Sequence, residues 1–232
     1  LLSGRLWVLP QAYVLSSDIS DIKRHISLSL TLSGMDDMRI DTVHRKNHTT
    51  LTIITRDRPG LFALLAGILA TNRIEITSAN IFTWYDGTVV DTFRVVPPWK
   101  DYNAWHTIEN QFRDFLSGKS DLNSRLMKTR ALKTGEPDTI PSREESVMSI
   151  DNTSSDFFTI IDVRTQKRIG LVHDISKKIS DFGYNIHRAF LSRSSDLFSL
   201  VYYVVDTGGE KITDEGRKKE LLRAVEEAIM MP

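Results

Sequence analysis

The residues best suited to bind a small molecule form a turn at positions 57–61, between a strand-like run and an apolar helical pattern. Pro59 can open the helix because its φ is already near helical values, and the first amides of a helix have no partner inside it, so the turn can receive a carboxylate. Gly60 lets a ligand approach the main chain closely, and the Asp57 carboxylate can pair with an ammonium group of that ligand. Alternatively, Gly60 only permits tight packing and Asp57 caps the helix. The residues by themselves support both interpretations equally.

A weaker copy of this turn and its surroundings lies 110 positions further along the chain. Setting Gly60 on Gly170 without a gap also superposes Arg58 on Arg168. The further matches are Leu61 with Leu171, Leu65 with Ile175, Leu69 with Ile179, Ile76 with Ile186, Ala79 with Ala189, Ile81 with Leu191, Phe93 with Tyr203 and Val95 with Val205. Repetition at a fixed spacing predicts two tandem copies of one module, joined by a polar interval.

The second copy of the turn departs from the first. Lys167 and Ile169 replace the acid and the proline. A ligand ammonium would face Lys167 instead of a carboxylate, so a second equivalent ligand site is in doubt. Gly170 and Asn185 can still help to build a site across the interface with the first module, although a strand-initiating role for Asn185 is the simpler interpretation.

The first module is predicted to run strand, helix, strand, strand, helix. Residues 50–55 mix β-branched and apolar side chains and indicate a strand before the first helix. Residues 74–82 and 88–95 indicate two more strands, joined by a hairpin turn in which Gly87 supplies positive φ. Residues 105–115 carry apolar side chains at steps of three and four, which is typical of a helix.

The second module repeats this order at residues 157–163, 171–182, 186–191, 198–205 and 222–229. A βαββαβ module needs a fourth strand, and the second copy leaves no room for one after its last helix. Residues 145–150 are a spare strand that can complete either module. The predicted fold class is α+β, with two tandem ferredoxin-like βαββαβ modules and an N-terminal helical segment. The aromatic residues predicted to belong to the core are Phe157, Phe158, Tyr202, Tyr203, Trp105, Phe112 and Phe115.

Residues 1–45 differ from the repeats. Ser17 can cap a helix that carries Ile19, Ile22 and Ile26 at helical spacing, and this helix would pack on the first module or on an upstream domain. Residues 45–48 would act as a hinge. The predicted divisions are a helical linker at 1–45, a first module at 46–130, a linker that can hold a shared strand at 131–155, and a second module at 156–232.

The composition excludes several classes of protein. Thirty basic residues balance thirty acidic ones, which leaves no excess positive field for nucleic acid or an anionic membrane. The absence of cysteine excludes disulfides, thiolate metal sites and cysteine nucleophiles, and agrees with a cytoplasmic location. No apolar run approaches the roughly 18 residues that a membrane span needs. The chain starts at Leu1 rather than at a methionine, and we expect a missing N-terminal portion.

Residues 57–93, DRPGLFALLAGILATNRIEITSANIFTWYDGTVVDTF, resemble the ACT domain, a small regulatory βαββαβ module. They are most similar to the ACT domains of the bifunctional uridylyltransferase/uridylyl-removing enzymes that modify the PII nitrogen-signalling protein. In that family a nucleotidyltransferase domain and an HD phosphohydrolase domain precede two C-terminal ACT domains that sense glutamine. Residues 9–25 also look like the segment that leaves the HD domain, so the resemblance covers roughly the whole chain.

The resemblance implies a regulatory fragment with no catalytic residues, no metal site and no cofactor of its own. Mg²⁺ is expected in the missing catalytic domains, and an amino acid, most directly glutamine, is the expected ligand. The expected partners are the upstream domains, PII for the full-length enzyme, and a second copy of the chain, because exposed sheet edges invite pairing. The residues expected to bind the ligand are Asp57, Arg58, Gly60, Leu61, Phe62, Gly170, Leu171 and Asn185.

Two other classes of function remain open. A stand-alone tandem ACT regulator, resembling the glycine-cleavage repressor type, would act through protein contacts alone; the absence of a starting methionine and the helical N-terminal segment argue against it. A hydrolase would use His173, Asp174 and Asp57. The repeat places His173 and Asp174 where the first module has Ala63 and Leu64, so we interpret the dipeptide as a coincidence. A nucleotidyltransferase needs a Gly-Ser turn followed by closely spaced aspartates that hold Mg²⁺, and this sequence contains no such arrangement.

Overall fold

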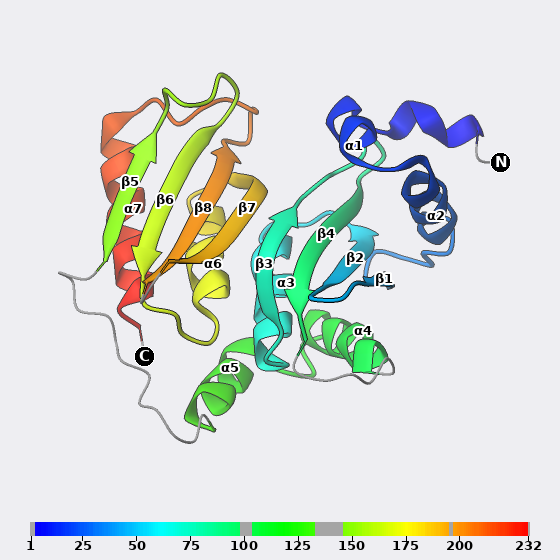
Figure 1. Ribbon diagram of the computed structural model, residues 1–232, viewed down its shortest axis with the longest axis horizontal. Coiled ribbons are helices and arrows are strands. Elements are labelled where there is room, and N and C mark those ends of the chain that lie inside the picture. The colour runs from blue at the N-terminus through cyan, green and yellow to red at the C-terminus, as the bar shows by residue number, and fades with distance from the viewer. Residues whose placement is uncertain (1–2, 98–103, 133–145, 195–196, 232) are drawn as a thin grey trace.

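Strands from both halves of the chain join edge to edge in the computed structural model, which describes residues 3–97, 104–132, 146–194 and 197–231. Within these residues they form one antiparallel sheet (Figure 1). Its strands are, in spatial order, β1 (Met38–His44), β2 (Thr49–Arg56), β4 (Thr88–Val96), β3 (Glu75–Asn80), β7 (Asn185–Ser194), β8 (Leu197–Val205), β6 (Thr159–Thr165) and β5 (Val147–Asp151). The helices are the 3-10 helix η1 (Ser3–Val8), α1 (Gln11–Ser16), α2 (Ile19–Ser29), α3 (Leu61–Thr71), α4 (Ala104–Leu116), α5 (Leu122–Ala131), α6 (Leu171–Asp181) and α7 (Glu215–Ile229). The predicted α+β class with two tandem ferredoxin-like modules is confirmed.

Helices pack on both faces of the sheet. On one face, α3, α4, α6 and α7 bury a core that continues across both modules and includes Leu51 and Ile161. On the opposite face of the first module, Tyr13 of α1 and Ile26 of α2 pack near Ile54 of β2. The N-terminal helices therefore pack on the first module, which is one of the two arrangements expected for them, although Ile19 of the predicted apolar face is 73% exposed.

The first module takes its fourth strand from its N-terminal side. β1 pairs antiparallel with β2, although its residues were expected to be part of a helical linker that ends at residue 45. That boundary is wrong, because the sheet of the first module begins at Met38. The connection at 45–48 is a tight hairpin turn and not a hinge: the Arg45 N–H donates to the His48 carbonyl over 2.9 Å.

The spare strand completes the second module. β5 pairs antiparallel with β6, so this module begins near Val147 and not at residue 156. In both modules the fourth strand precedes the other three instead of following them. The interval predicted to be a polar linker also contains α5, whose first turn is capped by Asp121 through a 2.8 Å bond from the Ser124 amide.

Three local predictions are wrong. α3 begins at Leu61 rather than at Pro59; Gly60 occupies the N-cap position with φ +71°, and no side chain caps the helix, which excludes Asp57 as its cap. Asp18, and not Ser17, is the N-cap residue of α2. Phe157 is 76% exposed because it precedes β6, whereas the predicted core residues Trp105, Phe112 and Tyr202 are buried.

The two modules superpose with a one-residue offset in their last strands. Leu51 pairs with Phe93, and Ile161, the repeat partner of Leu51, pairs with Tyr202 instead of Tyr203. A shift of one residue turns every side chain of a strand to the other face, and Tyr202 accordingly is buried in the core while Tyr203 is partly exposed. The corrected pairs are Phe93 with Tyr202 and Val95 with Val204.

β3 and β7 join the modules about a pseudo-twofold axis. Ala79 pairs with Ala189, its own repeat partner, and the pairs on either side obey the same symmetry. In the helix layer, α3 and α6 also meet through repeat partners, since the His173 Nδ1–H donates to the Ala63 carbonyl over 2.7 Å. The edges at β3 and β7 therefore pair within one chain, whereas edge pairing was expected between two copies.

Candidate ligand-binding site

The turn at 57–61 faces the second module. The Leu61 N–H donates to the Arg58 carbonyl over 3.2 Å, and the next amides, of Phe62 and Ala63, belong to the first helical turn, which has no intrahelical acceptors. A Cβ built on Gly60 would lie 3.6 Å from the Ser180 hydroxyl of α6. The N-terminus of α3 therefore opens into the junction between the modules.

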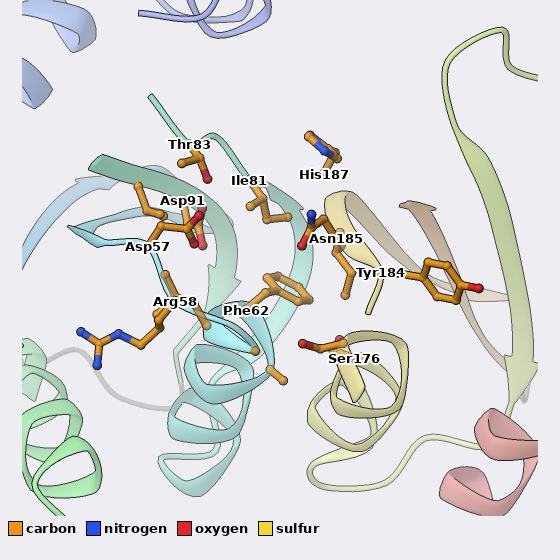
Figure 2. A pocket seen from close by; sticks show the side chains of 16 residues that line it. Asp57, Arg58, Phe62, Ile81, Thr83, Asp91, Ser176, Tyr184, Asn185 and His187 are labelled. Carbon is orange, nitrogen blue, oxygen red and sulfur yellow. The ribbon is translucent and has the colours of Figure 1, made fainter. Parts of the chain in front are cut away.

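A cavity of about 240 Å³ lies at this junction between the modules (Figure 2). One wall consists of the turn, the start of α3 and the strands that follow it, and the other consists of α6 and the start of β7. The lining residues of the first module are Asp57, Arg58, Gly60, Leu61, Phe62, Ala63, Ile81, Thr83, Val89 and Asp91; those of the second are Ser176, Ser180, Tyr184, Asn185, Ile186 and His187.

Two carboxyl groups lie on the first-module side of the cavity. Asp57 is exposed, whereas Asp91 is 1% exposed, and neither of its oxygens has a hydrogen-bond partner in the described part of the chain. Burial raises the pKa of Asp91 well above its usual value, and the Asp57 carboxylate raises it further. The nearby Phe82 N–H opposes the shift, although it does not reach hydrogen-bond geometry with either oxygen of Asp91. Sequence reasoning missed Asp91, because an acid inside a β-branched strand carries no local sign of a binding role.

The structure divides the predicted ligand-binding residues between two places. Asp57, Gly60, Leu61, Phe62 and Asn185 all line the cavity described above. The main chain of Arg58 lies in the same turn, but its side chain points away from the cavity (Figure 2). Its guanidinium group binds Asp36 at 3.2 Å and stacks on the ring of Phe112.

Gly170 and Leu171 line a different cavity, of about 440 Å³, at the pseudo-symmetric end of the interface. In the 110-residue repeat, Lys167 corresponds to Asp57 and Glu75 corresponds to Asn185. These two side chains form an ion pair of 2.5 Å with each other. The second turn thus offers a ligand neither the carboxylate of Asp57 nor the side-chain amide of Asn185, and the residues in their places are paired with each other. This agrees with the departure seen in its sequence.

Protein groups also hold the second turn from the helix side. Arg168 is buried, pairs with Asp174 at 2.5 Å and donates to the Ala228 carbonyl. Arg130 of α5 pairs with the same Asp174 at 2.6 Å and donates to the Ile169 carbonyl over 3.0 Å. A Cβ on Gly170 would lie only 2.8 Å from the Arg130 guanidinium, so this helix start is covered by the protein itself.

Of the three residues considered for a hydrolase, His173 and Asp174 have structural roles, whereas Asp57 lines the cavity between the modules. His173 is buried against α3, and burial lowers its pKa, although its bond to the Ala63 carbonyl opposes that change. Asp174 is engaged by two arginines. Across the described ranges, no cluster of three or more His, Cys, Asp or Glu side chains could hold a metal ion. No helix in the same ranges is both long and apolar enough to span a membrane.

Comparison with known proteins identifies the modules. A family model described as "ACR9-like, ACT-like domain" matches residues 147–232, which begin at the first residue of β5. The second module is an ACT-like domain. The first module repeats its topology and pairs with it about a pseudo-twofold axis, so the chain is a tandem pair of ACT-like modules.

The ACT pair is similar to bifunctional uridylyltransferase/uridylyl-removing enzymes of three bacteria. It is 32% identical to that of Gluconobacter oxydans over 75% of this chain, 28% to that of Novosphingobium aromaticivorans over 86%, and 26% to that of Erythrobacter litoralis over 98%. The chain spans 18%, 23% and 24% of these relatives, respectively. It therefore corresponds to the ACT-bearing region of much longer enzymes.

Proposed function

We propose that this ACT pair binds a free amino acid, most directly glutamine, between its modules and thereby regulates the catalytic domains of a uridylyltransferase/uridylyl-removing enzyme. One observation carries the proposal: the N-terminus of α3, which attracts anions, lines the same cavity as the Asp57 carboxylate, which attracts cations, and as the acid Asp91. A zwitterionic amino acid presents both charges on one carbon atom. The names of the three bacterial relatives support the enzymatic context.

The cavity suggests how the ligand lies. Its carboxylate would accept hydrogen bonds from the amides of Phe62 and Ala63, and its ammonium group would pair with Asp57. Its side chain would then extend toward the second module, where Asn185 and Ser180 offer both donors and acceptors. The ligand would thus touch both modules at once.

The same polar groups favour glutamine over related amino acids. A side-chain amide needs one donor and one acceptor, and Asn185 can supply both. Glutamate would add a negative charge to a cavity that already holds Asp57 and Asp91. A branched-chain amino acid would leave polar groups of the cavity without partners once they are desolvated.

Regulation would follow from contact with both modules. Binding favours whichever relative arrangement of the modules holds the ligand better, and the coupling free energy equals the difference in affinity between the two arrangements. In the full-length enzyme, low glutamine would permit uridylylation of PII and high glutamine would favour removal of the uridylyl group. The direction of this response is taken from the family that the sequence resembles.

Calorimetric titration of residues 1–232 tests the proposal. Glutamine should bind saturably, whereas glutamate, glycine and the branched-chain amino acids should bind at least tenfold more weakly. Asp57→Ala should weaken glutamine binding at least tenfold, because the loss of a charge-assisted bond costs about 1.5–3 kcal/mol. The control is Asp156→Ala, which removes an exposed acid of the second module and should leave the affinity unchanged.

Two results would contradict the proposed function. The first is the absence of saturable binding by every amino acid in the series. The second is glutamine binding that survives Asp57→Ala unchanged, which would place the ligand outside the cavity between the modules.

A further inference from the structure

Asp91 is an unpaired acid in the core of the first module. It lies on β4 between Val89 and Phe93, on the strand face that packs against the helices, and opposite Ile53 of β2. A buried polar group without a partner destabilises a fold by roughly 1–3 kcal/mol. Native proteins keep few such groups, so this one requires an explanation.

The second module shows that the fold does not need an acid here. Ile53 pairs with Asp91, and Val163, the repeat partner of Ile53, pairs with Leu200. Leu200 is fully buried in the same core. Because an apolar residue fills this position in the second module, packing of the sheet does not require an acid here, and in the first module the acid lines the cavity.

We infer that Asp91 and Asp57 together hold the ligand's ammonium group, and that Asp91 releases a proton when the ligand binds. This inference rests on the amino-acid site proposed above. The two acids lie next to each other on the same cavity wall (Figure 2), and the Asp57 carboxylate acts on Asp91. Asp57 is exposed, whereas Asp91 is buried. An ammonium group has three N–H donors, so it can bind both carboxylates and still carry one further bond.

The exchange balances in atoms and charge. In the free protein the protonated form of Asp91 is favoured, because burial and then the Asp57 charge raise the pKa of this carboxyl group well above its usual value. The incoming ammonium group supplies a cation beside it and stabilises the carboxylate. The carboxyl O–H bond breaks, the proton goes to the solvent, and the ammonium group takes its place.

The other ionisable groups of the cavity would not release a proton when the ligand binds. Arg58 turns its guanidinium group toward Asp36, and Tyr184 points away from the cavity (Figure 2). His187 is exposed at the rim, and partial desolvation of its ring and then Arg188 lower its pKa, which favours the neutral ring before binding. A ligand carboxylate near His187 would cause proton uptake, which has the opposite sign.

The acidic pair restricts the class of ligand. Glutamine carries the required cation, whereas N-acetylglutamine keeps the carboxylate and the side-chain amide but has no positive charge. Such a ligand cannot offset the charge of Asp57 beside an ionised Asp91. We therefore expect the site to bind free amino acids and to exclude their N-acyl derivatives.

Calorimetry with the full chain tests this inference. Glutamine is titrated near pH 7 in two buffers that differ in ionisation enthalpy, and the difference in apparent binding enthalpy gives the number of protons released. The wild-type chain should release about one proton per ligand. Asp91→Asn, which keeps the shape of the side chain, should release none and should bind glutamine at least tenfold more weakly. N-acetylglutamine should not saturate the wild-type chain.

The outcomes separate this inference from the proposed function. If no amino acid binds the wild-type chain, both fail. If glutamine binds without proton release, or binds Asp91→Asn as tightly as the wild type, the inference about Asp91 fails while the amino-acid site stands. Proton release by the wild-type chain is informative even if the variant does not fold, and circular dichroism reports whether it does.

Discussion

Lys167 and Glu75 form an ion pair across the module interface at the positions that the pseudo-twofold axis equates with Asp57 and Asn185. The distance from Nζ to Oε1 is 2.5 Å. On this side of the interface the protein supplies both partners of a bridge between the modules. On the other side, an acid and an amide line a cavity that a ligand can bridge.

We therefore expect one amino acid per chain at saturation. Glu75→Gln breaks the ion pair but restores no acid to the second turn, so the stoichiometry of glutamine binding should stay at one. Because both side chains are almost half exposed, the free energy of unfolding should fall by only about 0.2–1 kcal/mol. Calorimetry gives the stoichiometry, and urea unfolding gives the free energy. Two bound ligands in the wild-type chain would refute this asymmetry.

The two turn glycines should respond differently to alanine. Gly60 and Gly170 have φ of +71° and +80°, so either substitution strains the backbone by about 1–2 kcal/mol. Gly170→Ala should destabilise the chain more, because its Cβ would lie 2.8 Å from the Arg130 guanidinium, which is held by Asp174. Of the two variants, only Gly60→Ala should also weaken glutamine binding. Equal losses of affinity in both variants would show that the second turn takes part in binding.

Gly67 permits the close approach of α3 and α6. Alanine normally stabilises a helix interior by about 1 kcal/mol relative to glycine. Here its Cβ would lie 2.7 Å from Leu122 and 2.8 Å from Nδ1 of His173, so Gly67→Ala should lower the free energy of unfolding by about 1–3 kcal/mol. The double variant with His173→Ala should lose less than the sum of the single variants, as a double-mutant cycle would measure. Additive losses would show that the two residues do not clash.

Asp91 should destabilise the free protein at neutral pH. An unfolded aspartate has a pKa of about 3.9, and the folded pKa of Asp91 is raised by burial and then by Asp57. Between these values the folded state binds one more proton than the unfolded state, so this group lowers stability as the pH rises. Asp91→Asn should match the wild type in stability below about pH 4 and exceed it near pH 7.

Urea unfolding at several pH values measures this difference, with the exposed Asp156→Asn as a control that should show no such trend. A variant that is less stable than the wild type at neutral pH would indicate that the Asp91 carboxyl group supports the fold. If Asp91→Asn is more stable than the wild type at neutral pH but binds glutamine more weakly, Asp91 contributes to ligand binding at the expense of stability.

Much of the architecture was predictable because its signals are local. The helical spacing of apolar residues predicted α3, α4, α6 and α7, and the repeat of Gly60 at Gly170 predicted two modules. β1 was not predicted although Met38 and Ile40 alternate with Arg39 and Asp41, which is typical of a strand; the segment is short and was assigned to the helical region that precedes it. The membership of β5 could not be predicted either, because strand pairing depends on residues distant in sequence.

The sequence by itself determined the turn, with its glycine and its acid, and the loss of that acid at Lys167. These properties depend on neighbouring residues and on backbone sterics. Only the tertiary structure decided what faces the turn: Asn185 arrives through the pairing of β3 with β7, and Asp91 through the register of β4 against β2. A one-residue offset between the modules places Leu200 where the first module has Asp91, and no gapless alignment of the repeat reveals it. Register is decided by the burial of whole strand faces, so it appears only when the sheet is assembled.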